Sequence, residues 1–224
     1  MTVRKIIFSV EEFYHLYSRG VDKRSIFLDD ADRKRFVRLL FLCNGTKPVM
    51  YRETKKLSLK DIDAGQKLVA IGAYCLMPNH FHLLIKEITE GGIVKFMSKL
   101  LTAYSTYFNK KYERAGSLFS SEFKSTHLDV DKYLKYIFAY IHLNPLKILN
   151  ANWKNEKMDI SQTELFLNAY KYSSYHDHIS ENREEYMILN KVVFPEYFKN
   201  VDNFKNNIYD WINFTEPSPR RGWG

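Results

Sequence analysis

Residues 73–87 read AYCLMPNHFHLLIKE and carry two histidines, His80 and His82, on either side of Phe81. The β-prone residues around the Pro-Asn pair predict two strands joined by a tight turn. Successive side chains of a strand point to opposite faces, so both imidazoles should leave one face and Phe81 the other. Two neighbouring neutral imidazoles suit a divalent metal ion, and they equally suit two solvated histidines on an exposed face.

Composition limits the class of protein. The 224 residues suit one domain, or one domain with an appended piece, and a hydrophobic content of 45% supports a sizeable core. Lysine and arginine number 34 against 26 acidic residues, giving a net charge of +8. This excess favours a polyanionic partner, nucleic acid first, although an ordinary basic enzyme can carry the same charge.

Cysteine usage and the N-terminus indicate the compartment. Cys43 and Cys75 lie in apolar segments, which favours buried thiols in a reducing compartment over a disulfide framework. No apolar run has the length of a transmembrane helix, and Glu11 and Glu12 interrupt the N-terminal apolar stretch before a signal peptide is complete. We therefore expect a cytoplasmic protein with no membrane partner.

The order of elements predicts the fold. Hydrophobic spacing and breaker residues indicate strands and helices in the order β-α-β-β-α-β-α, with Pro145 ending the third helix. This order predicts an α+β fold, a ferredoxin-like antiparallel sheet with helices on one face. We expect a catalytic domain over residues 1–150. A mostly helical C-terminal extension would fill residues 151–224, with short helices near 161–170, 183–190 and 202–212 and a disordered basic tail, EPSPRRGWG.

The third helix offers chemistry to combine with the histidines. Tyr140 and Asn144 are four residues apart, so they share a helical face. If this helix packs near the histidine strand, Asn144 can supply an amide oxygen to a metal, and Tyr140 a nucleophilic hydroxyl. Ordinary roles explain both residues equally well, because most of the 16 tyrosines must serve packing and asparagine before proline commonly ends a helix.

The segments YCLMPNHFHLLIK and YIFAYIHLNP together resemble the HUH single-tyrosine transposases, in particular the REP-associated tyrosine transposases. The family name describes histidine, a hydrophobic residue and histidine, which His80, Phe81 and His82 match. The segments YHLYSRG, FMSKLLTAYSTYFNKKYERAGSLF and YKYSSYHDH extend the resemblance over residues 13–178.

The resemblance implies a metal-dependent enzyme that cleaves and rejoins single-stranded DNA beside a hairpin. Tyr140 would attack a phosphodiester to give a 5′-phosphotyrosine link and a free 3′-OH, and a second strand would resolve the link. His80, His82 and Asn144 would hold Mg²⁺ or Mn²⁺. Arg19 and Lys124 are the expected nucleic-acid contacts, and the family acts as monomers or homodimers.

Three other functions fit the same residues. A host-retained relative would bind hairpin DNA or RNA without transposition, and a metal-dependent nuclease would use water and leave no covalent product. A plain α+β RNA-binding domain would tolerate the loss of both histidines. The sequence determines neither the hairpin recognised nor the oligomeric state.

Overall fold

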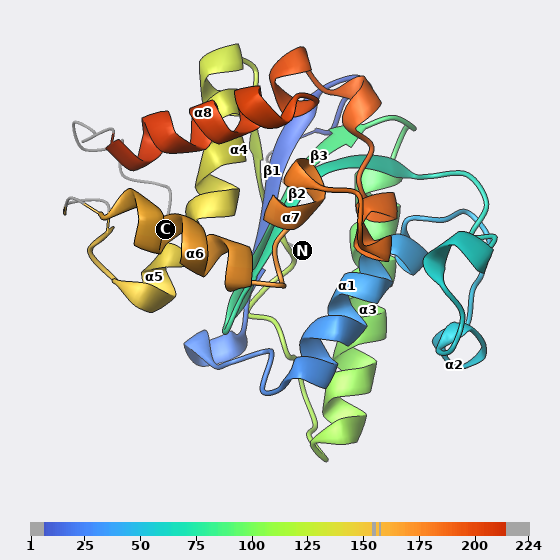
Figure 1. Ribbon diagram of the computed structural model, residues 1–224. Helices are drawn as coiled ribbons and strands as arrows, with labels where there is room; N and C mark the ends of the chain where they lie inside the picture. The colour runs from blue at the N-terminus through green and yellow to red at the C-terminus, as the bar shows by residue number, and fades with distance from the viewer. Residues whose placement is uncertain (1–6, 154–155, 157, 214–224) are drawn as a thin grey trace.

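A four-stranded antiparallel sheet lies at the centre of the folded structure (Figure 1). The computed structural model describes residues 7–153, 156 and 158–213; the predicted basic tail lies outside them. The strands pair in the order β2-β3-β1-β4, and every neighbouring pair is antiparallel. This is the ferredoxin-like order that the sequence predicts. Their bounds are β1 Phe13–Arg19, β2 Val69–Met77, β3 His80–Glu87 and β4 Lys124–His127.

Helices α1 (Asp30–Cys43) and α3 (Gly92–Lys111) cover one face of this sheet. A capping box starts α1: the Asp29 carboxylate accepts from the amide of Asp32, and the Asp32 carboxylate accepts from the amide of Asp29. The apolar faces of both helices are fully buried against the sheet, including Phe36 and Phe96. The short helix α2 (Tyr51–Thr54) lies beside the middle of α1, where Arg38 donates a hydrogen bond to the carbonyl of Thr54.

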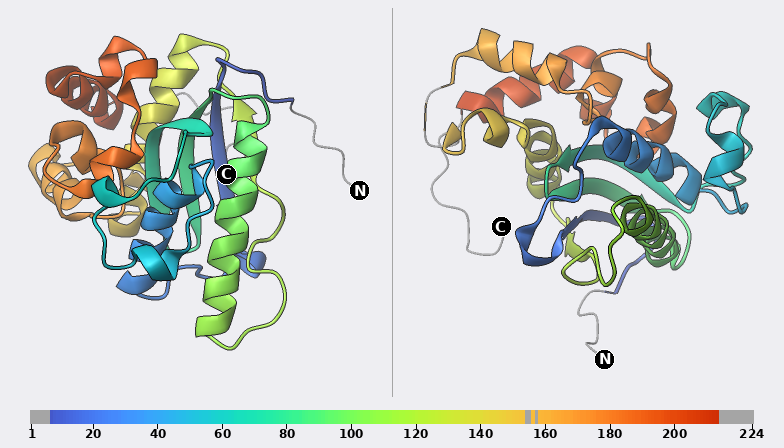
Figure 2. Two further views of the ribbon diagram at one scale, coloured as in Figure 1. Left: turned by 90° about the vertical axis from the view of Figure 1, so that its right-hand side faces the viewer. Right: turned by 90° about the horizontal axis from the view of Figure 1, so that it is seen from below.

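Helix α4 (Asp131–Leu143) packs on the opposite face of the sheet. Its buried residues Ile137 and Ile141 share a core with Cys75 of β2 and Leu84 of β3. The α+β class is thus confirmed, while helices lie on both faces of the sheet rather than on one (Figure 2). The physical reason is that β2 is buried along its whole length, as expected of a strand covered on both sides.

The C-terminal segment adds further helices to the α4 side: α5 Leu146–Leu149, α6 Ile160–Ala169, α7 Tyr175–Ile179 and α8 Val201–Asn213. The helices expected near 161–170 and 202–212 are confirmed, and the expected third one is the 3-10 turn Glu184–Ile188. Phe204 and Ile208 of α8 are buried against α4. This segment therefore shares its core with the helix that carries Tyr140.

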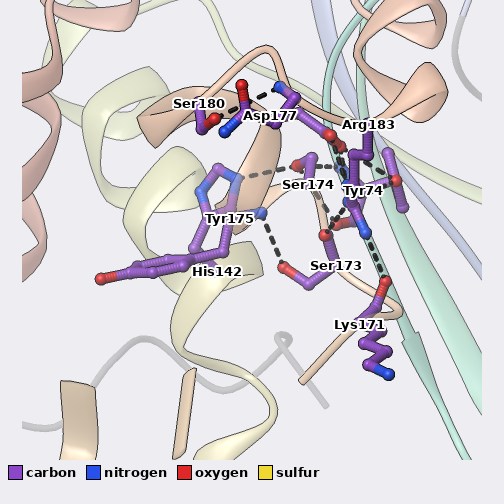
Figure 3. A network of polar contacts seen from close by, with 10 residues as sticks. Tyr74, His142, Lys171, Ser173, Ser174, Tyr175, Asp177, Ser180 and Arg183 are labelled. Carbon is purple, nitrogen blue, oxygen red and sulfur yellow. Dashed lines mark hydrogen bonds and ion pairs between the residues drawn. The ribbon is translucent and has the colours of Figure 1, made fainter. Parts of the chain in front are cut away.

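A buried polar network fastens the C-terminal segment to β2 and to α4 (Figure 3). The amide of Ser174 donates to the carbonyl of Tyr74 at 2.9 Å, and the amide of Tyr74 donates to the Ser174 hydroxyl at 2.9 Å. His142 donates through Nδ1 to the carbonyl of Phe138, so its Nε2 accepts from Ser174 Oγ at 2.8 Å. Ser174 thereby holds α4 two residues from Tyr140.

Five histidines in this fold are buried as neutral groups, which predicts acid lability. Burial lowers the pKa of His15, His80 and His178 to about 3 and that of His82 and His142 well below the ordinary value of 6.5.

Below a pH of about 6.5 the unfolded chain takes up protons at these positions and the folded chain does not, so stability falls as pH decreases. We expect the unfolding free energy, measured with urea, to decrease by at least ~2 kcal/mol between about pH 7.5 and about pH 5. An unchanged value would mean that these histidines take up protons in the folded state as readily as in the unfolded chain.

Candidate active site

Strand β3 places His80 and His82 side by side on the α4 face of the sheet. Their ring centroids lie 4.9 Å apart, and Phe81 between them is buried in the core on the other face. His80 is 9% exposed and His82 is 5% exposed, so the two are neither solvated surface residues nor part of the apolar clusters. Burial lowers the pKa of both, with Arg19 and Lys147 as further causes, and both are neutral at physiological pH.

Each of these histidines has one ring nitrogen engaged in a hydrogen bond. Nδ1 of His82 lies 2.9 Å from Nε2 of His15, and Nδ1 of His80 lies 2.6 Å from Oδ1 of Asn79. Nε2 of His82 is buried and has no hydrogen-bond partner among the described residues. Such an arrangement fixes the ring orientation and leaves Nε2 available, as in metal-binding histidines.

Helix α4 brings Tyr140 next to this pair. The centroid of its ring lies 5.4 Å from that of His82, and its hydroxyl accepts a hydrogen bond from Lys147 Nζ at 3.2 Å. The ring of Tyr136 stacks on Tyr140 at 5.9 Å. Tyr140 is therefore held between the histidine pair and a second tyrosine.

A pocket of about 310 Å³ joins these side chains. His80, His82 and Tyr140 line it together with the two predicted nucleic-acid contacts, Arg19 and Lys124. The remaining lining residues are mostly polar or basic: Tyr17, Ser18, Gly20, Asp22, Lys23, Ser120, Ser121 and Lys147. Five of the six site residues expected from the sequence thus border one cavity.

Asn144 is the sixth expected site residue and does not line the pocket. It is the C-cap of α4 and is fully buried. Both polar atoms of its side chain lack a hydrogen-bond partner within the described ranges. Leaving a buried amide unsatisfied costs about 1–3 kcal/mol, so this side chain is suited to a ligand.

Sequence reasoning missed three residues of the pocket region. His15 and Tyr17 point from β1 to the same side as Arg19, and the antiparallel register places Tyr17 opposite His82. The sequence FYHLYSR could have indicated this, because alternate residues of a strand share one face, which puts His15 and Tyr17 on the same face as Arg19. Lys147 was the third, and its seven-residue spacing from Tyr140 was its signal.

The histidine, cysteine, aspartate and glutamate side chains of the described residues do not form a complete metal site. Residues 7–153, 156 and 158–213 hold no group of three or more His, Cys, Asp or Glu placed to hold a metal ion. Any metal at the His80–His82 pair therefore needs oxygen ligands of another type, such as an amide, a phosphate or water.

Across the same ranges, no helix is both long and apolar enough to cross a membrane.

Comparison with known proteins gives one family match. Residues 37–144 match the family model described as "Transposase IS200 like". No curated protein sequence matches the chain. Among solved structures, "Structure of the REP associates tyrosine transposase bound to a REP hairpin" aligns with a TM-score of 0.49 at 12% sequence identity, covering 82% of this chain and 88% of that chain.

Proposed function

We propose that this chain, whose residues 37–144 match the IS200-like transposase family model, cleaves and rejoins single-stranded DNA beside a hairpin through a phosphotyrosine on Tyr140. The observation that carries this proposal is the shared pocket: the Tyr140 ring lies against His82, and His80 lines the same cavity. A nucleophile beside two neutral imidazoles that could hold a metal ion is a combination suited to metal-assisted phosphoryl transfer.

The charge of the pocket supports a DNA strand as the ligand. Arg19 from β1, Lys124 from β4 and Lys147 from α5 border the cavity, and Asp22 is the only acidic residue among those described that line it. Cations on three elements around one cavity suit a bent phosphate backbone. Tyr17, between them, offers a ring for stacking on an unpaired base.

The reaction exchanges one phosphodiester for another. The Tyr140 oxygen forms a bond to phosphorus, and the bond from phosphorus to the 3′-oxygen breaks, leaving a 5′-phosphotyrosine and a 3′-OH. The 3′-OH of a second strand then attacks the same phosphorus and releases Tyr140. The phosphotyrosine conserves the energy of the cleaved phosphodiester bond, so the cycle needs no nucleoside triphosphate.

The residues present fit a divalent metal ion of the Mg²⁺ or Mn²⁺ type. His80 and His82 would hold it through Nε2, because their Nδ1 atoms are engaged, and Asn144 would add its amide oxygen. When bound, the ion neutralises phosphate charge and orients the scissile group. The protein supplies two neutral imidazoles, which burial keeps unprotonated.

We assign catalysis to residues 1–150 and a supporting role to residues 151–224, acting in the cytoplasm. The contacts of Ser174 with His142 and Tyr74 support this assignment, because they hold α4 against the sheet beside Tyr140. The extension thereby fixes the position of the nucleophile without lining the pocket in the described part of the chain.

A denaturing gel tests the proposal against its rivals. Wild-type protein is incubated with hairpin-bearing single strands and Mn²⁺, and a slower protein–DNA band is expected that EDTA abolishes. Cleaved DNA without that band would favour a nuclease that uses water. Binding with no cleavage would favour a host-retained hairpin-binding protein.

A further inference from the structure

Lys147 lies two helical turns beyond Tyr140 on the same face of one nearly continuous helix. Although α4 ends at Leu143, the backbone stays helical through Asn144 (φ −54°, ψ −37°) and Pro145 (φ −56°, ψ −25°) into α5. The amide of Lys147 donates to the carbonyl of Asn144 at 3.1 Å. Residues seven apart in a helix face the same way, so the chain itself places Lys147 beside Tyr140.

The contact between the two side chains is direct. Lys147 Nζ donates to the Tyr140 hydroxyl at 3.2 Å and lies 5.2 Å from the centre of the Tyr140 ring. Lys147 is half-buried and borders the pocket together with Tyr140 and both histidines. Its ammonium therefore sits on the oxygen that would attack, in the absence of any DNA.

We propose that Lys147 is a further catalytic residue, whose ammonium holds the Tyr140 oxygen and stabilises its negative charge during attack on the phosphodiester. The inference rests on the proposed role of Tyr140 as nucleophile. The Tyr140 proton passes to water, the bond from its oxygen to phosphorus forms, and the bond to the 3′-oxygen breaks. The leaving oxygen keeps the electron pair and takes a proton from water, while Lys147 stays protonated throughout.

A purely phosphate-binding lysine would behave differently. Such a residue stabilises the bound DNA, so its loss weakens affinity and leaves the rate at saturating DNA unchanged. A lysine on the nucleophile acts on charge that develops only during attack, so its loss lowers that rate and spares affinity. The two roles are therefore separated by measuring the dissociation constant and the single-turnover rate on the same variants.

The test compares Lys147→Met, Lys147→Arg and the control Lys132→Met, which replaces an exposed lysine at the start of α4. We expect Lys147→Met to slow covalent adduct formation at saturating DNA by ~100-fold or more, with the dissociation constant within about threefold of wild type. Arginine keeps the positive donor and should recover the rate to within about tenfold of wild type. Lys132→Met should react like wild type. Lys147→Gln replaces Lys147→Met if the latter melts at a lower temperature.

A substrate with sulfur in place of the bridging 3′-oxygen separates help to the nucleophile from help to the leaving group. The thiolate leaves without a proton, so a lysine that served the leaving group would become dispensable. We expect the Lys147→Met defect to persist on this substrate. Restoration by sulfur, or a normal rate at saturating DNA with weakened affinity, would overturn the inference while Tyr140 remained the nucleophile. A wild-type protein that forms no adduct at all would refute the proposed function, and this inference with it.

Discussion

The Tyr140→Phe variant is expected to form no covalent protein–DNA product while keeping its fold and its affinity for hairpin DNA. The substitution removes only a hydroxyl, whose hydrogen bond from Lys147 contributes about 1 kcal/mol to stability. Loss of the attacking atom should lower the rate of adduct formation by more than about 10⁴-fold. A denaturing gel with Mn²⁺ measures the product, and a filter-binding assay measures affinity.

Two neighbouring tyrosines provide matched controls for this variant. Tyr17 lines the same pocket, with its ring centroid 5.9 Å from that of His82, and Tyr136 stacks on Tyr140. Tyr17→Phe and Tyr136→Phe should both still form the adduct, as should Tyr133→Phe at its exposed position. If Tyr17→Phe loses the product and Tyr140→Phe keeps it, the nucleophile belongs to β1. If Tyr136→Phe alone loses it, the nucleophile lies one helical turn earlier.

The second large effect, a loss of DNA cleavage, is expected when either His80 or His82 is replaced. We expect His80→Ala and His82→Ala to reduce DNA cleavage by more than about 10³-fold, because each removes an imidazole that would bind the metal. Both variants should also lose Mn²⁺ binding, measured by electron paramagnetic resonance in the absence of DNA. The His82 variant should lose some stability as well, because it removes the buried hydrogen bond between His82 Nδ1 and His15 Nε2.

His127→Ala is the matched control for these two variants. His127 lies on β4, outside the pocket lining, and its Nε2 is 2.8 Å from a carboxylate oxygen of the exposed Glu12. This variant should cleave DNA and bind Mn²⁺ as the wild type does. If either His80→Ala or His82→Ala cleaves DNA at the wild-type rate, the proposed metal-binding role of the pair is wrong. A collapse of thermal stability in both would instead make them core histidines.

Much of the fold follows from local signals. The alternation around Phe81 and the turn before His80 define β3, and acidic residues before Phe36 define the start of α1. Those local signals did not determine which face of the sheet α4 covers. A continuous apolar run such as β2 reads the same whether helices cover one face or both, so only the packing of distant elements decides.

The candidate site was predictable where spacing along one element decides the geometry. His80 with His82, and Tyr140 on its helix, are cases of this kind. His15 required the pairing register between β1 and β3, which is a long-range property. Lys147 was hidden because Pro145 indicated the end of a helix, whereas the backbone stays helical through it.

The residue that carries the covalent bond to DNA decides whether Tyr140 is the nucleophile. After reaction with hairpin-bearing single strands and Mn²⁺, the protein is digested with trypsin and the DNA with nuclease, and the modified peptide is sequenced by tandem mass spectrometry. The tryptic peptide YIFAYIHLNPLK, residues 136–147, contains Tyr136 and Tyr140 but not Tyr17. We predict a nucleotide remnant joined through its 5′-phosphate to Tyr140. A remnant on any other residue, or cleaved DNA with no modified peptide, would contradict the account.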